Sequence, residues 1–340
     1  MRKRAVAAVA VAITALAIAA VGSSTSANAP AATTGYVATG KTPIKLAFST
    51  WNGYMALVIA AKEGYYKNHG LKVTYTVIED PVQRFNAFKA GSLNAIATTV
   101  DTYSRTYAKG IKSVEVLGLD ASAGGDGIVA DKSITSVEQL KGQKVAVSAG
   151  STSQWLLAYV LSLHHLSLKD VEQVDLTSGD AGAAFAAGRV KVAVTWQPWL
   201  SKAEQNPNGH VLISTKQYPT IITDHVAFSP SFVKQHPDEV KAFIAAYNDA
   251  MKLIRTNPSK AFADVHDYLG QSADDIKATM KDVPLWSVAQ SKKYYGTKSH
   301  PGAIYKIFTK SANFWKSIGE IKTVPSPKNA IDPTFVNSFK

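Results

Sequence analysis

The side chains with the clearest chemical potential are aromatic and acidic residues that stand beside expected strand ends and chain crossings. The aromatic set is Trp51, Tyr54, Trp196 and Trp199, and the acidic set is Asp101, Asp120, Asp126 and Asp224. An aromatic ring face attracts a positively charged nitrogen, and an ionised carboxylate pairs with the same group. These residues therefore indicate a site for an amine or another cation. For each of them, ordinary packing or a role in a turn is the alternative.

Two small polar turns favour a negatively charged ligand instead. Residues 50–54 and 149–153 each follow an expected strand and precede an expected helix. Backbone amides and hydroxyls at a helix N-terminus favour an anion. If the two turns face each other, they suit a carboxylate or sulfonate head. Candidate ligand residues of this kind are Gly53, Thr99, Ser148 and Ser151.

The elements that position these residues alternate between strands and helices. Hydrophobic patterning predicts strands at 44–49, 73–78 and 94–99, with helices at 55–68 and 81–89. A second series has strands at 145–148, 171–176 and 190–195, with helices at 154–164 and 181–187. Ligands of such β/α units bind beyond the carboxyl ends of the strands. Besides the candidates above, this rule selects Ser49, Thr50, Asn52, Thr98, Thr152 and Ser153.

The two series look like copies of one unit. Phe88 and Gly91 recur 97 residues later as Phe185 and Gly188, each time just before a strand. Equal offsets indicate a structural duplication, so we expect an α/β protein with two lobes. The stretch 119–130 (LDASAGGDGIVA) separates the copies and is the expected first crossing between the lobes. The segment 221–229, after an expected strand at 210–214, is the expected return.

The ends of the chain complete the expected domain organisation. Residues 1–29 have a basic start, an apolar stretch and an A-x-A ending, the pattern of a secretory signal peptide cleaved after Ala27 or Ala29. Residues 30–42 read as a flexible lead-in. Lobe 1 is expected at 43–120 plus 226–340, lobe 2 at 127–222, with crossings near 121–126 and 222–226. C-terminal helices at 237–257, 259–269, 272–280 and 304–318 should pack mainly on lobe 1.

Composition narrows the function classes. The chain has 340 residues, is 46% hydrophobic and 18% charged, and carries a formal charge of +12, but its lysines are scattered, so we expect no nucleic-acid partner. The absence of cysteine excludes disulfides, thiol catalysis and lipid attachment through cysteine. Gly125, Gly127 and Ala130 fit a dinucleotide fingerprint, but a strand-like stretch follows them. We expect no cofactor, no metal and no catalytic site.

Several motifs together resemble a known family. They are WNGY (51–54), AGSLNAIATT (90–99), GGDGIVA (124–130), VEQLKGQKVAVSAGS (137–151) and AAGRVKVAVTWQPW (186–199). With the duplicated lobes and the export signal, they resemble the nitrate/sulfonate/taurine branch of ABC-transporter solute-binding proteins over about 43–257. Where that family commonly has Glu before Pro in its W-x-P-W approach, this chain has Gln197.

The resemblance implies a type II periplasmic-binding-protein fold, a hinge between the lobes, and delivery of a small polar solute to a membrane permease. It implies a monomer outside the cytoplasm that takes a sulfonate, taurine, nitrate or a related nitrogen- or sulfur-containing compound. A zwitterion such as taurine would satisfy both the acidic and the amide-rich halves of the expected site. An enzyme on the same fold, like the thiamine-pyrimidine synthases, and a ligand-binding sensor are the alternatives.

Overall fold

The computed structural model describes residues 42–339. The expected signal peptide and all of the lead-in except residue 42 lie outside this range. Among the described residues, no helix combines the length and apolar character needed to cross a membrane.

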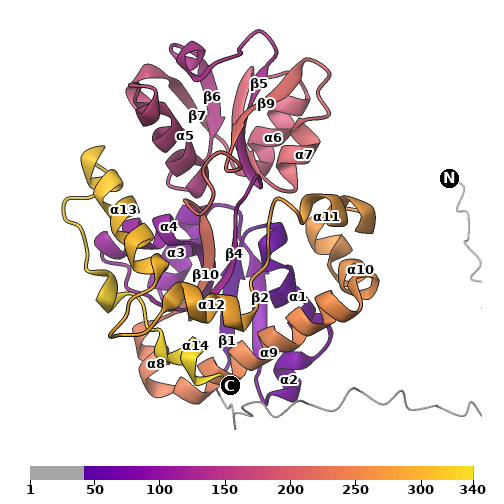
Figure 1. Cartoon of the computed structure of the whole chain (residues 1–340), viewed down its shortest axis with the longest axis vertical. Coiled ribbons are helices and arrows are strands. Elements are labelled where there is room, and N and C mark those ends of the chain that lie inside the picture. Colours follow the sequence, from indigo (N-terminus) through magenta and orange to yellow (C-terminus); the bar gives the residue numbers. More distant parts are fainter. Residues whose placement is uncertain (1–41, 340) are drawn as a thin grey trace, which may run out of the picture. The chain divides into compact units, whose positions relative to one another are not determined.

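Two five-stranded sheets organise the described chain (Figure 1). The first, sheet A, has the order β2-β1-β3-β10-β4. Its strands are β1 (Ile44–Phe48), β2 (Val73–Val77), β3 (Ala95–Thr99), β4 (Val114–Ala121) and β10 (Thr223–Phe228). Strands β2 and β3 pair parallel to β1, whereas β10 lies antiparallel between β3 and β4.

Sheet B repeats this plan with the order β7-β6-β8-β5-β9. Its strands are β5 (Asp126–Asp131), β6 (Lys144–Val147), β7 (Glu172–Asp175), β8 (Val192–Trp196) and β9 (Gly209–Ser214). Here β5 is the antiparallel strand, between β8 and β9. The chain leaves sheet A through β4 to β5 and returns through β9 to β10. The matching orders confirm the α/β class and agree with the duplication inferred from the 97-residue offset.

Helices flank both sheets. Around sheet A are α1 (Met55–Lys62), α2 (Tyr65–Asn68), α3 (Pro81–Lys89), α4 (Val100–Ala108) and the C-terminal helices. Sheet B carries α5 (Thr152–Leu163), α6 (Ser178–Ala186) and α7 (Trp199–Ala203). The C-terminal helices are α8 (Pro230–Gln235), α9 (Pro237–Thr256), α10 (Pro258–Leu269), α11 (Ala273–Thr279), α12 (Val288–Tyr295), α13 (Ala303–Ser317) and α14 (Thr334–Ser338).

Some local expectations need correction. The single helix expected at 55–68 is two helices, because Gly64 adopts a left-handed backbone with φ of 72° between α1 and α2. Residues 223–228, expected as part of a plain crossing, form the buried strand β10. Helices α4 and α12 and strand β4 were not expected at all.

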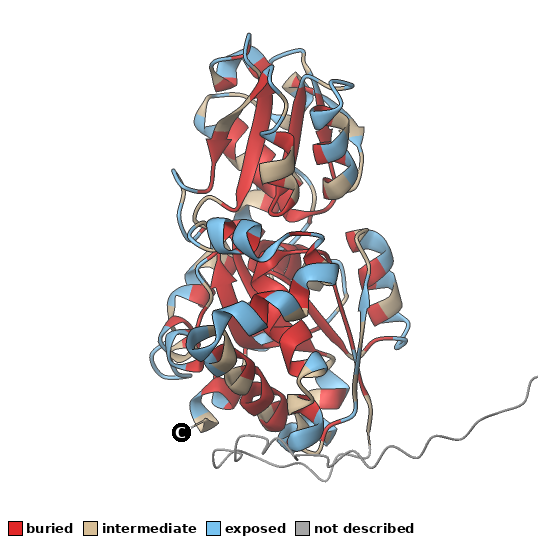
Figure 2. Ribbon diagram, turned by 90° about the vertical axis from the view of Figure 1, so that its right-hand side faces the viewer, coloured by how far each residue is buried: buried red, intermediate tan, exposed pale blue. Residues whose placement is uncertain are grey.

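The core lies on the faces of both sheets (Figure 2). A large apolar cluster packs sheet A against α1 and α9. A second cluster covers sheet B and includes Trp155 of α5, whose ring centroid lies 5.9 Å from that of Trp315 on α13. Helix α13 also packs on α4. The C-terminal end of α13 therefore contacts helices beside both sheets, although the sequence placed the C-terminal helices mainly on lobe 1.

Candidate ligand-binding site

A pocket lies where the carboxyl ends of central strands from both sheets meet. Its lining comes from the ends of β1 and β3, the start of α3, the two crossings, the start of α5 and the end of β8. The lining residues are Ser49, Trp51, Tyr54, Pro81, Arg84, Thr98, Thr99, Thr102, Asp126, Ser151, Thr152, Trp196, Ile222 and Asp224. Its cavity volume is about 20 Å³, which is room for about one water molecule. In this conformation, a larger solute enters only if the walls move apart.

Seven of the twelve candidate ligand residues come together in this lining. From sheet A and its turns come Trp51, Tyr54, Thr99 and Asp224; from the first crossing and sheet B come Asp126, Ser151 and Trp196. Ser49, Thr98 and Thr152, which the strand-end rule also selects, line the pocket as well. The rule thus places residues that are far apart in the chain around one cavity.

The aromatic residues of the pocket already have partners for their polar groups. Trp51 donates from Nε1 to both carboxylate oxygens of Asp120 at 3.3 Å. Trp196 donates from Nε1 to the backbone oxygen of Thr50 at 2.8 Å, which links β8 to the turn after β1. The Tyr54 hydroxyl donates to Asp224. Since both indole N–H groups are occupied, the two tryptophans offer a solute their ring surfaces.

All four candidate aspartates are buried, with relative exposures of 2% or less. Burial raises the pKa of Asp224 to about 7, against the opposing hydrogen bond from Tyr54. Burial and the nearby Asp224 charge raise the pKa of Asp120 well above its usual range. Burial also raises the pKa of Asp126, although the Ser122 hydroxyl opposes the shift. In the empty pocket, burial therefore favours the protonated form of each of these carboxyl groups.

Asp101 lies directly behind the lining, at the junction of two helix N-termini. It stands in the first turn of α4, and its carboxylate accepts from the hydroxyls of Thr102 and of Thr152, the first residue of α5, each at 3.2 Å. Burial raises its pKa to about 6, against these hydrogen bonds. Asp101 thus places the protein's own carboxyl group where the two helix dipoles favour negative charge.

Four other candidates lie outside the lining. Asp120 is behind Trp51, and a Cβ on Gly53 would lie 2.0 Å from an Asp120 oxygen, so Gly53 is needed for close packing. Ser148 is buried, and its carbonyl accepts from the Ser151 hydroxyl at 2.8 Å. Trp199 begins α7 and packs against Gly179 and Gly182 of α6.

The sequence analysis missed Arg84, Pro81, Thr102 and Ile222, of which Arg84 matters most. Arg84 is 3% exposed and lines the pocket from the first turns of α3. Its Nη1 donates to the Ile78 carbonyl at 2.8 Å, while its Nε is buried and has no hydrogen-bond partner among the described residues. The strand-end rule, applied also to β2, would have pointed to the start of α3, whereas the burial of Arg84 follows from how that helix packs.

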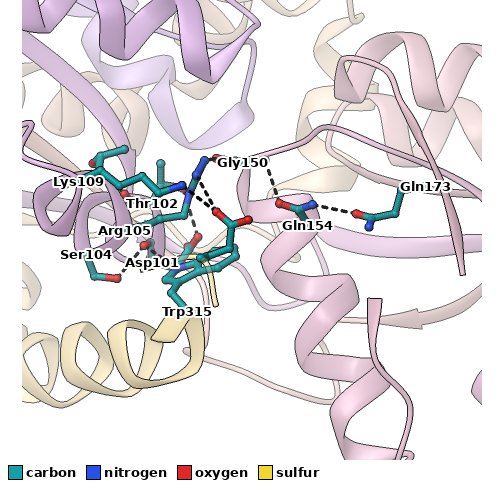
Figure 3. Close-up of polar contacts among 11 residues, drawn as sticks. Asp101, Thr102, Ser104, Arg105, Lys109, Gly150, Gln154, Gln173 and Trp315 are labelled. Carbon is teal, nitrogen blue, oxygen red and sulfur yellow. Dashed lines mark hydrogen bonds and ion pairs between the residues drawn. The ribbon is translucent and has the colours of Figure 1, made fainter. Parts of the chain in front are cut away.

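Further contacts join the sheet A side to the sheet B side next to the pocket (Figure 3). Arg105 of α4 donates from Nη2 to the carbonyl of Gly150, in the turn before α5, at 3.0 Å. Its guanidinium lies 5.5 Å from the ring centroid of Trp315 and 3.4 Å from a Glu320 oxygen. At the first crossing, the Ser122 and Thr215 hydroxyls lie 2.7 Å apart, and Asp126 donates its amide to Ser122 at 3.0 Å.

Two α/β sheets of the same order, joined by two chain crossings with a pocket at their strand ends, define the periplasmic-binding-protein fold. The structure has a TM-score of 0.70 with the periplasmic aliphatic sulphonate binding protein SsuA from Escherichia coli, at 19% identity, over 88% of this chain and 100% of that one. The desulfurization enzyme DSZB matches with a TM-score of 0.60 at 16% identity, over 87% and 98% of the two chains. The fold therefore occurs in binding proteins and in at least one enzyme.

Sequence comparisons assign the family. The family model described as NMT1/THI5 like matches residues 51–261, and the chain belongs to this family. It is 21% identical over 292 residues to a protein of Brucella abortus (strain 2308) named as a binding protein, covering 84% of this chain and 89% of the relative. It is 26% identical over 225 residues to the taurine-binding periplasmic protein of Escherichia coli (strain K12), covering 62% and 67%. The family resemblance inferred from the motifs is thereby confirmed.

Proposed function

We propose that this protein is the extracytoplasmic solute-binding component of an ABC importer, and that it captures one small polar solute in the pocket between its two lobes. The observation that carries the proposal is the pocket lining, to which both sheets contribute. The names of the relatives point to taurine or sulfonates as the class of solute, or to a related nitrogen- or sulfur-containing compound. A membrane permease would receive the solute, and the protein would act as a monomer.

The proposed mechanism is closure of a hinge. The lobes would be residues 43–120 plus 226–340 and residues 127–222, joined by two crossings. Trp51 and Tyr54 would contact the solute from one side, and Trp196 and Ser151 from the other. Because the pocket now has room for about one water molecule, the solute would enter with the lobes apart. Its contacts to both walls would then stabilise the closed arrangement only.

An enzyme on the same scaffold is the second candidate, and the DSZB structure is the reason to keep it. The pocket lining described above contains neither histidine nor cysteine. Nucleophilic or acid–base catalysis would therefore have to use aspartate, tyrosine or a hydroxyl group there. The two candidates differ in the fate of the solute, which a binding protein releases unchanged and an enzyme converts. A sensor component would bind the same solute and differ only in the protein that docks on it.

A thermal-shift panel combined with solute recovery tests the proposal. The mature chain is heated with taurine, ethanesulfonate, nitrate, a thiamine pyrimidine and small amines, each at high excess. A solute at 100 times its Kd stabilises the fold by about 2.7 kcal/mol, or several degrees in Tm for a chain of this size. Mass spectrometry then asks whether the stabilising solute is recovered unchanged. Recovery of an altered product would replace the binding proposal with the enzyme.

A second experiment needs no assumption about the solute. The protein is purified from its own cells without dialysis and denatured, and the released small molecules are identified by mass spectrometry. Uptake of the identified compound is then compared in cells with and without the gene. Equal uptake in the two strains would contradict a role in import.

A further inference from the structure

The charges around the pocket are unequal. The lining contains two aspartates, Asp126 and Asp224, and one arginine, Arg84. Two more buried aspartates stand directly behind it, since Asp120 accepts from Trp51 and Asp101 accepts from Thr152. An anionic solute in this pocket would therefore face up to four carboxyl groups at close range, in surroundings where burial reduces solvent screening.

The positive ends of the helix dipoles do not offset this excess of carboxyl groups over cations. Helix α5 begins next to the pocket, and its cap residue Ser151 accepts from the amide of Ser153 at 3.1 Å. Helix α4 begins at the same place, but Asp101 lies in its first turn and also accepts from Thr152 at the start of α5. Because a carboxyl group already occupies the position that both dipoles favour, little of their field is left for an anionic head.

Arg84 and Asp126 approach the pocket from different sheets. Arg84 is on α3, which follows β2 of sheet A, whereas Asp126 is the first residue of β5 in sheet B. The buried Nε of Arg84 still lacks a hydrogen-bond acceptor among the described residues. Against the effect of burial, the Arg84 charge lowers the pKa of Asp224, so Arg84 lies nearer to Asp224 than a fully separate site would require. The lining therefore has carboxyl groups for a cation and, on the Asp224 side, a donor for an acceptor group.

The aromatic residues add to the cation-binding character. Trp51 and Trp196 come from opposite sheets, and the N–H of each already has a partner. Ring surfaces without competing donors suit the cationic end of a solute, because a ring face attracts a positively charged nitrogen.

We propose, on the basis of the solute-binding function above, that the pocket selects a solute with a positively charged nitrogen, which Asp126 and Asp224 hold beside the two tryptophans. At its other end the solute carries a hydrogen-bond acceptor that takes the free Nε–H of Arg84. The nitrogen decides selectivity, so a sulfonate or carboxylate that lacks it is a poor ligand even when its size is right.

Proton release provides a readout of the sign of the ligand charge. Since the pKa of Asp224 is raised to about 7 in the solute-free pocket, the carboxyl group is partly protonated near neutral pH. A bound cation favours the ionised carboxylate and expels the proton. A bound anion disfavours ionisation and takes a proton up. Calorimetric titrations at pH 7 in two buffers of different ionisation enthalpy distinguish release from uptake.

The test uses matched pairs of probes that differ in the nitrogen. Taurine is compared with 2-hydroxyethanesulfonate, and β-alanine with propionate, by calorimetry on the signal-free protein. We expect the nitrogen-bearing member of at least one pair to bind at least tenfold more tightly than its partner and to release protons. Asp126→Asn should reduce this ratio to threefold or less. The matched control is Asp267→Asn, because the Asp267 side chain is 86% exposed and outside the pocket; it should leave the ratio unchanged.

The outcomes separate this inference from the proposed function. Equal or tighter binding of the nitrogen-free partner, or proton uptake on binding, overturns the charge assignment but leaves a solute-binding protein. No binding by either nitrogen-bearing probe, together with a nitrogen-free compound released from the native protein, also overturns it. Chemical conversion of a probe instead overturns the proposed function. The comparison of pairs on the unsubstituted protein stays decisive even if Asp126→Asn does not fold.

Discussion

Arg105→Gln is the substitution that should most directly loosen the contact between the two sides of the pocket. Arg105 is 8% exposed, and its Nη2 donates to the Gly150 carbonyl at 3.0 Å across the two sides. A hydrogen bond from a charged group contributes about 1.5–3 kcal/mol net. If this bond exists only in the closed arrangement, its loss shifts the open–closed equilibrium roughly 10- to 150-fold toward the open form. Where the open form already dominates without solute, Kd rises by the same factor.

The sequence allows the separation of the lobes to be measured with dyes attached at chosen cysteines. Because it contains no cysteine, Lys67→Cys and Lys169→Cys, at exposed positions of α2 and of the segment before β7, introduce two unique labelling sites. Energy transfer between dyes at these positions reports the separation of the lobes with and without solute. We expect Arg105→Gln to lower the transfer efficiency at intermediate solute concentrations, so that the closing transition moves to higher solute. Calorimetry on the unlabelled protein measures the accompanying change in Kd.

Lys109→Gln is the matched control. Lys109 pairs with the same Glu320 carboxylate at 2.8 Å, but its side chain is 45% exposed, and exposed ion pairs contribute little. A second perturbation is Gly150→Ala, whose Cβ would lie 1.9 Å from the Arg105 guanidinium, at a backbone φ of 70°. The reasoning fails if Arg105→Gln behaves like the unsubstituted protein, or if Lys109→Gln weakens binding equally.

Three further outcomes follow from buried polar groups. Glu115→Gln should raise Tm at pH 8 and leave it nearly unchanged at pH 4. Burial raises the pKa of Glu115, and neither of its oxygens has a hydrogen-bond partner among the described residues, so the fold loses stability as pH rises above the ordinary value of 4.5. An equal change at both pH values would contradict this. Trp196→Phe should weaken solute binding about 5- to 100-fold by calorimetry, because it leaves the Thr50 carbonyl without its 2.8 Å donor; unchanged affinity would remove Trp196 from the closing contacts. As pH rises from 5 to 8, the Tm of the protein without solute should fall, and the increase in Tm that taurine causes should grow. Melting curves with and without taurine measure both trends. An increase in Tm that becomes smaller as pH rises would refute the assignment of a cationic ligand.

The pocket residues that the sequence predicted share one property: their position follows from a local pattern. Trp51 and Trp196 stand just after or at the end of apolar strands, and such ends meet at one edge of a β/α sheet. The repeat at Phe88 and Phe185 then indicated that two such edges exist. Their meeting around one cavity could be expected from topology, without knowledge of any single contact.

The residues that were missed or misplaced depend on tertiary packing. Arg84 lies on a nine-residue helix whose sequence does not mark it as buried, and its burial follows from how α3 meets the pocket. Strand β4 contains Glu115, Gly118 and Asp120, so its sequence lacks the alternation of a half-exposed strand although it is almost wholly buried. Trp199 stands four residues beyond the predicted strand end, where it starts α7 and turns toward α6.

The buried aspartates link the stability of the empty protein to the charge of its solute. A carboxyl group taken out of water is held protonated unless donors or a cation compensate it, and the pKa of about 7 at Asp224 reflects this balance. In the empty protein, folding therefore keeps a proton that the unfolded chain has released above its ordinary pKa of 3.8. Stability accordingly declines as pH rises toward 7. A cationic solute removes that penalty by pairing with the carboxylate, so the pH range that weakens the empty fold is the range in which such a solute binds best.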